Sequence, residues 1–289
     1  QYAYRTGKIK SIWKEYGEKM KLILEGYRAG TDFNIRLEPD CLISAGAPGK
    51  ALTWMDAVVD GKPVTPRTGK AVDINALWYN AVMFSLAAAK SVQDFAFEGE
   101  WEPVALRIPD SFVNTFWNEE KGLLADYVDG EYKDWAVRPN MLFAASLPFS
   151  PVNEEIRKTI VTRVKQELLT PRGIRTLSPV SAAYRGICYG NQTERDLAYH
   201  QGTVWPWLLG HFAEAYLKLH GRSGLSFIKN IYQGFEPVLM EYCIGSVPEI
   251  FDGDPPYAPR GAISQAWSVA ELLRIGEMID SMEKDIDQK

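Results

Sequence analysis

Hydrophobic side chains recur every three or four residues along much of the chain, and this spacing predicts amphipathic helices. Helices are predicted over 9–28, 73–90, 104–117, 138–147, 153–169, 203–219, 223–241 and 261–280. Asp73 and Asn153 stand where a helix-capping side chain is expected. Strand patterns are almost absent and predict only short hairpins over 34–45 and 122–127.

Three long polar segments separate these helices, over 46–70, 172–200 and 243–260. They exceed ordinary connection lengths, which is typical of loops that carry function. The absence of alternating strands and helices excludes Rossmann and TIM-barrel folds, and no fixed-period repeat supports a helical array. The pattern therefore predicts an all-α fold, an α/α toroid with short β-hairpins in its loops, as a single domain over 1–289.

Composition and charge limit the kinds of partner that this chain can bind. A hydrophobic fraction of 46% in 289 residues suffices for one large core, and no apolar run of membrane-spanning length occurs. Scattered basic residues and a net charge of −5 argue against nucleic acid. Cys41, Cys188 and Cys243 have no disulfide or metal-ligand spacing and are expected to be buried thiols. These thiols favour a cytoplasmic location, with the periplasm as the alternative.

Two loop carboxylates are candidates for acid–base chemistry. Asp56 and Glu249 are flanked by aromatic or apolar residues, and such surroundings favour the protonated carboxyl that a general acid needs. Glycoside hydrolysis uses two carboxyl groups on opposite sides of the scissile bond. The residues alone leave simpler interpretations open: a turn cap for Asp56 and a solvated carboxylate for Glu249.

The chain is also rich in aromatic residues, with nine tryptophans, fourteen tyrosines and twelve phenylalanines. Rings beside polar loop residues suit sugar binding, because they pair an apolar face with hydrogen-bonding neighbours. Structural contacts within the loops are the alternative for the side chains concerned. They are Trp54, Trp78, Trp205, Arg67, Arg175, Arg260, His200 and Gln201. Helical spacing instead predicts core positions for Trp13, Trp117 and Trp267.

Six segments in order carry a family resemblance: LTWMDA, TPRTGKAVDINALWYN, RPNMLFAASLP, LLTPRGIRTLSP, RDLAYHQGTVWPWLLG and EIFDGDPPYAPRGAISQAWSVAELLR. Over roughly residues 10–280 the chain resembles the amylo-α-1,6-glucosidase family, the glucosidase domain of glycogen debranching enzymes. Val247-Pro248, Tyr257 and Ala262 depart from the residues expected there.

The resemblance implies an (α/α)6 toroid and an inverting glycoside hydrolase that releases glucose from α-1,6-linked stubs of glycogen or related limit dextrins. It makes Asp56 the general acid and Glu249 the general base, and it implies a branched α-glucan or oligosaccharide as substrate, with neither metal nor organic cofactor. The implied sugar-pocket residues are Trp54, Arg67, Asn75, Trp78, Tyr79, Arg175, His200, Gln201 and Trp205.

The predicted helices are too few for six helix pairs. We therefore expect a toroid that is incomplete at its N-terminus, as in the C-terminal part of a longer enzyme, or one that is open on one side. In the open form, apolar faces near Trp13 and Trp267 would lack neighbours and favour association. Alternative functions are another toroid α-glucosidase (α-1,4, trehalose or kojibiose type), a toroid epimerase, for which the histidines are few, or a non-catalytic glycan-binding module.

Overall fold

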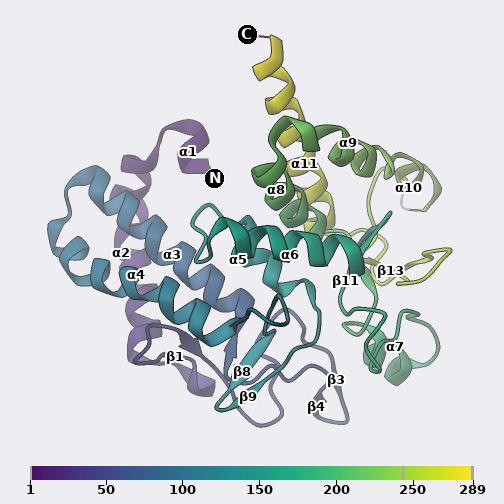
Figure 1. Cartoon of the computed structure of the whole chain (residues 1–289), viewed down its shortest axis with the longest axis horizontal. Coiled ribbons are helices and arrows are strands. Elements are labelled where there is room, and N and C mark those ends of the chain that lie inside the picture. Colours follow the sequence, from purple (N-terminus) through teal and green to yellow (C-terminus); the bar gives the residue numbers. More distant parts are fainter. Residues whose placement is uncertain (1, 243, 288–289) are drawn as a thin grey trace.

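The computed structural model describes residues 2–242 and 244–287, and Figure 1 shows its helices lying above most of the short strands. The helices are α1 (Tyr2–Thr6), α2 (Ile9–Ala29), α3 (Val72–Val92), α4 (Phe95–Phe116), α5 (Leu142–Ser146), α6 (Glu154–Glu167), α7 (Gln192–Ala198), α8 (Leu208–His220), α9 (Leu225–Gln233), α10 (Glu236–Glu241) and α11 (Ala266–Asp287). Shorter 3-10 turns are η1 (Asp32–Asn34), η2 (Pro139–Met141) and η3 (Gly221–Gly224).

The strands are two or three residues long. They are β1 (Arg36–Leu37), β2 (Ile43–Ser44), β3 (Val58–Val59), β4 (Lys62–Pro63), β5 (Lys70–Ala71), β6 (Trp117–Asn118), β7 (Leu123–Leu124), β8 (Tyr127–Asp129), β9 (Tyr132–Lys133), β10 (Leu169–Thr170), β11 (Gly173–Arg175), β12 (Val204–Trp205), β13 (Ile250–Phe251) and β14 (Pro259–Arg260).

Helices with a regular apolar stripe agree with the sequence. In α2 the chain leaves the helix at Gly30, which adopts a φ of 91° that favours glycine. The N-cap of α6 is Asn153, whose side chain accepts a hydrogen bond from the backbone N–H of Ile156 at 2.9 Å. The predicted hairpin over 34–45 is confirmed by the pairing of β1 with β2.

Other boundaries differ from the predictions. Ala71 is the N-cap residue of α3, and Asp73 lies inside the helix. The predicted helix 104–117 begins earlier, at the side-chain cap of Asp94, and contains two prolines that interrupt its pattern. Strand β12 occupies the start of the predicted helix 203–219, and the predicted helix 223–241 divides into α9 and α10. The segment expected to be irregular, 172–200, contains β11 and α7.

The helices pack around one row of contacts: α3 contacts α5, α5 contacts α8, and α8 contacts α11. Helices α4, α6 and α9 pack against members of this row. Helix α2 packs on α3, where Trp13 is buried edge-on against Phe97 of α4 at 4.9 Å. Trp13 therefore lies in the core, as its helical spacing predicted, whereas Trp267 stacks on Trp207 at 5.0 Å but keeps 36% of its surface exposed. The fold is helix-rich. The toroid that is incomplete at its N-terminus and the single-domain organisation stay predictions.

The row places the long loops together. Helices α3, α8 and α11 each follow a strand-bearing segment (46–71, 172–207 and 244–265), so these segments lie at the N-terminal ends of packed neighbours. Strands β10 to β14 form one antiparallel five-stranded sheet in chain order, in which Val204 faces Phe251. None of these strands was predicted individually, because strands of two or three residues are too short to show alternation.

Among the helices of the described residues, none combines the length and the apolar character needed to cross a membrane.

Candidate functional site

Asp56 lies on a loop whose backbone is held firmly. Its neighbours Met55 and Ala57 are buried, and Asp56 itself is exposed. The Thr65 hydroxyl donates to the Met55 carbonyl at 3.1 Å. On the other side, the Trp54 indole N–H donates to Oδ1 of Asn140 at 2.8 Å. These contacts present the Asp56 carboxylate from an ordered segment.

A buried charge network lies beneath this loop. The Arg67 guanidinium contacts Asp126 through Nε and Asp73 through Nη2, each at 2.7 Å, and the Arg67 side chain is 1% exposed. Burial alone lowers the pKa of Arg67, but the charges of Asp126 and Asp73 and their hydrogen bonds outweigh it and raise the pKa. Asn140 donates to Asp126 at 2.7 Å, which links the network to Trp54.

Trp54 joins the first loop to the second. Its ring meets His200 at 5.3 Å, Trp205 at 5.4 Å and Trp207 at 5.2 Å, each edge-on. His200 in turn stacks on Trp205 with an angle of 16° between the rings. Because Trp205 belongs to β12 and is 2% exposed, this aromatic cluster is anchored in the five-stranded sheet.

Glu249 directly precedes β13 and is held by the start of the next segment. Its backbone N–H donates to the Ala262 carbonyl at 2.9 Å, and Oε2 accepts from the Ala262 N–H at 3.1 Å. The Gln265 side chain donates to Oε1 at 3.3 Å. With donors on both oxygens, the Glu249 carboxylate is oriented and is suited to accept a proton.

Gly261 shapes the space around that carboxylate. It has a φ of 68°, and a Cβ placed there would lie 2.2 Å from Oε2 of Glu249. A side chain at this position would therefore have to displace Glu249.

We expect Gly261→Ala to lower glycosidase activity by about 10²-fold, because a displacement of about 1 Å in a reacting group has that effect. Initial-rate measurements of glucose release test this. Gly130→Ala is the matched control, since Gly130 also has a positive φ, of 57°, but a Cβ there meets nothing within 4 Å. Equal activity losses in the two variants would attribute the effect to backbone strain alone.

Tyr199 brings the two carboxylates into one site. Its pKa is raised first by burial, then by hydrogen bonding to Glu249 and the charge of Glu249, and further by the charge of Asp56, so its hydroxyl lies near both carboxylates. The Tyr199 ring packs against Trp205 at 5.1 Å. The Tyr199 phenol, which belongs to the second loop, therefore lies near one carboxylate from the first loop and one from the third.

His200 is buried without a hydrogen-bond partner on either ring nitrogen among the described residues. Burial, reinforced by the positive charges of Arg138 and Arg67, lowers its pKa to about 3. The imidazole is therefore neutral at physiological pH. His211 has its pKa lowered to about 3 for the same leading reason and shares a 2.8 Å hydrogen bond with Ser146.

These histidines predict a pH dependence of stability. An unfolded histidine takes up its proton near pH 6.5 and the folded ones only near pH 3, so acidification favours the unfolded state. Between about pH 6.5 and 5 each histidine is expected to remove about 2 kcal/mol from the free energy of unfolding. Urea titrations across this pH range should show that the free energy of unfolding declines less steeply in His211→Gln than in the wild-type protein. His220→Gln, at an exposed position, should keep the wild-type slope, and a slope unchanged in both variants would contradict the assignment.

Several predicted pocket residues lie in the same region. Arg175 donates from Nε to the Gly253 carbonyl at 2.9 Å and so connects the second and third loops. Gln201 accepts from Arg138 at 2.6 Å. Arg260 pairs with Asp252 at 2.9 Å. Together with Trp54, His200 and Trp205, Arg175 and Gln201 belong to the loops that converge on Asp56 and Glu249, and their sugar contacts stay predictions.

The predicted residues on α3 lie differently. Asn75 is fully buried and bonds both backbone groups of Ile43, at 2.6 and 3.0 Å. Trp78 donates to the Cys41 carbonyl at 3.1 Å and packs among core rings. Tyr79 lines a separate hollow between α3 and α4. The structure does not bring these three side chains beside the two carboxylates.

Three further residues of this site were not singled out from the sequence: Tyr199, Asn140 and Asp126. Tyr199 and Asn140 lie in two of the segments that carry the family resemblance, and Asp126 lies outside them. Only their neighbours in space distinguish them from other polar residues.

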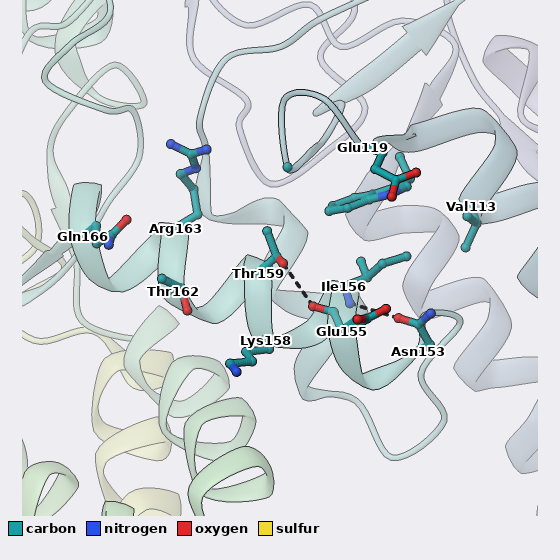
Figure 2. A pocket seen from close by; sticks show the side chains of 12 residues that line it. Val113, Glu119, Asn153, Glu155, Ile156, Lys158, Thr159, Thr162, Arg163 and Gln166 are labelled. Atoms are coloured by element: carbon teal, nitrogen blue, oxygen red, sulfur yellow. Dashed lines mark hydrogen bonds between the residues drawn. The ribbon is translucent and has the colours of Figure 1, made fainter.

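A hollow of about 790 Å³ lies away from this site, on the outer side of α6. Figure 2 shows Thr159 bonded to the Glu155 carbonyl and Asn153 capping the helix at Ile156, so part of its polar lining serves α6 itself. It contains none of the predicted site residues.

Cys41 and Cys188 are buried free thiols, as expected, and Cys243 lies outside the described residues. Within 2–242 and 244–287, no three metal-binding side chains gather into a group that could hold an ion.

Comparisons with known proteins agree on a family. The family model described as amylo-alpha-1,6-glucosidase matches residues 1–274. The glycogen debranching enzyme of Saccharomyces cerevisiae is 27% identical over 88% of this chain and 20% of its own length. The periplasmic trehalase of Escherichia coli O1:K1 is 27% identical over 47% of this chain and 24% of its own length. The chain spans about a fifth of the yeast relative. It belongs to the amylo-alpha-1,6-glucosidase family of glycoside hydrolases.

Proposed function

We propose that this chain is an inverting glycoside hydrolase that releases glucose from α-1,6-linked branch stubs of glycogen or related limit dextrins. The observation that carries the proposal is the placement of the Tyr199 phenol, which lies near both Glu249 and Asp56. Two carboxylates around one aromatic-lined site suit glycosidic bond cleavage.

In this mechanism Asp56 acts as the general acid and protonates the glycosidic oxygen as the bond from that oxygen to C1 breaks. Glu249 takes a proton from a water molecule, whose oxygen forms the new bond to C1 on the opposite face of the sugar. The α-linked stub is thereby released as β-glucose. The donors on Glu249 from Ala262 and Gln265 support the base role, because they hold both carboxylate oxygens in a fixed orientation.

The terminal glucose is proposed to occupy the space beside the aromatic cluster of Trp54, His200 and Trp205. Among these three rings Trp54 is the partly exposed one and offers its apolar surface to the sugar, whereas the buried His200 and Trp205 pack against it and hold it in place. This chain spans about a fifth of the yeast relative, so the proposed substrate is a branched α-glucan that binds to this chain alone or within a larger protein. A cytoplasmic location also stays a proposal.

Proton NMR of the newly released sugar tests the mechanism directly. Incubation with a dextrin that bears single α-1,6-linked glucose branches should give β-glucose first, with α-glucose appearing only by mutarotation. Initial release of α-glucose would contradict inversion. Faster release from maltodextrin, trehalose or kojibiose than from this branched dextrin would favour another toroid α-glucosidase, and binding without release would favour a glycan-binding module.

A further inference from the structure

We propose that the cavity between α7 and strands β13–β14 binds the α-glucan chain on the leaving-group side of the scissile bond, with Tyr189 as its stacking platform. The assignment rests on the proposed hydrolase function and adds to it where the rest of the polymer lies.

The cavity adjoins Glu249, and one of its walls packs against the segment that follows Asp56. It has a volume of about 510 Å³, within the range of ligand pockets, and Tyr199 and Gly261 form part of its wall. Both of these residues contact Glu249. Helix α7, on the other wall, packs against β3, which begins two residues after Asp56. A chain lying in this cavity can therefore reach a bond held between Asp56 and Glu249.

The Tyr189 ring contacts a fixed side chain and is also exposed to solvent. It is 72% exposed, and the Arg260 guanidinium lies 5.3 Å from its ring centroid. Arg260 is itself fixed by a 2.9 Å ion pair with buried Asp252. An anchored aromatic ring with so much free surface can stack against the C–H face of a pyranose.

The polar side of the cavity is ordered in advance. Gln192 donates to Asp196 at 2.7 Å, and Arg195 donates to Gln192 at 2.8 Å and to the Gly190 carbonyl at 2.6 Å. The start of α7 is fixed by reciprocal bonds between Asn191 and Glu194. Groups held in this way lose little conformational freedom when they bind hydroxyls.

The charges of the cavity favour a neutral ligand. Arg195 stands beside Asp196 on α7, and Arg260 is neutralised by Asp252, so neither sign dominates. Cys188 also lines the wall, but burial raises its pKa to about 11, and a protonated thiol is a poor nucleophile. A neutral polyhydroxylated chain fits this lining better than an ionic ligand does.

Comparing two substrates with different leaving groups isolates the contribution of this cavity to hydrolysis. In α-glucosyl fluoride the leaving group is a single atom, whereas a limit dextrin places a glucan chain there. We expect Tyr189→Ala to lower kcat/KM for the limit dextrin about 10-fold, mainly through KM, and to leave α-glucosyl fluoride hydrolysis unchanged. Tyr189→Trp should retain activity on both. Tyr132→Ala, which removes another exposed tyrosine, is the control and should change neither rate.

Calorimetric titration with maltotetraose supplies a readout independent of turnover, and Tyr189→Ala should weaken its binding at least fivefold. Equal losses on both substrates, or equal maltotetraose affinities, would overturn the assignment while the hydrolase proposal stands. A third outcome is that Tyr189→Ala binds maltotetraose more weakly than the wild-type protein does, while the wild-type protein cleaves neither substrate. This outcome would support a glucan site and reject the hydrolase function.

Discussion

Replacing Glu249 with glutamine or Asp56 with asparagine is expected to lower glucose release from a limit dextrin by about 10²–10⁴-fold, the usual contribution of a general acid or base. Glutamine at 249 keeps the shape of the side chain but cannot take the proton of the attacking water. Asparagine at 56 cannot protonate the leaving oxygen. The Asp56 variant should recover on α-glucosyl fluoride, because fluoride leaves without a proton, whereas the Glu249 variant should not.

This difference between substrates separates the two roles. Rates should be measured together with circular dichroism, which should be unchanged because neither carboxylate is buried. Asp60→Asn and Glu119→Gln remove exposed carboxylates elsewhere and should keep wild-type rates. Near-normal glucose release by both site variants would show that neither carboxylate has the proposed role.

The second large effect concerns stability. Arg67→Met should lower the free energy of unfolding by about 3–5 kcal/mol, because it leaves the carboxylates of Asp73 and Asp126 buried without their cation. The loss should also loosen Asn140 and Trp54, so tryptophan fluorescence should change before global unfolding. Denaturant titration followed by fluorescence measures both.

A matched control is available in Arg163, which forms a partly exposed pair with Glu167 four residues along α6. Arg163→Met should change the free energy of unfolding by no more than about 0.5 kcal/mol. The triple variant Arg67→Met, Asp73→Asn, Asp126→Asn should regain part of the lost stability, since it removes the uncompensated charges. If Arg67→Met and Arg163→Met had equal free energies of unfolding, the buried network would not stabilise the fold.

Local patterns predicted local features well. Helices α2 and α6 were predicted nearly to their ends, because their apolar stripes and terminal Gly30 and Asn153 act within a few residues. The short hairpin β1–β2 followed from its turn residues for the same reason. Helix α4 was placed too late because prolines within it resemble a boundary.

Roles that depend on partners far along the chain could not be inferred in this way. Asp73 looked like a helix cap from its position, yet its carboxylate bonds Arg67 in a buried network that also needs Asp126. In the sequence nothing distinguishes Tyr199 from the other tyrosines. In the structure the pairing of β12 with β13 places it near Glu249.

The sequence by itself determined that the chain is helical with long functional loops, and its ordered motifs indicated the family and the two candidate carboxylates. Only the tertiary structure decided which side chains share a site. Periodicity reports the face of one element, whereas a site requires long-range contacts: Trp54 against Trp205, and β12 against β13. These contacts bring residues 56, 199 and 249 to one place, and no local pattern encodes their meeting.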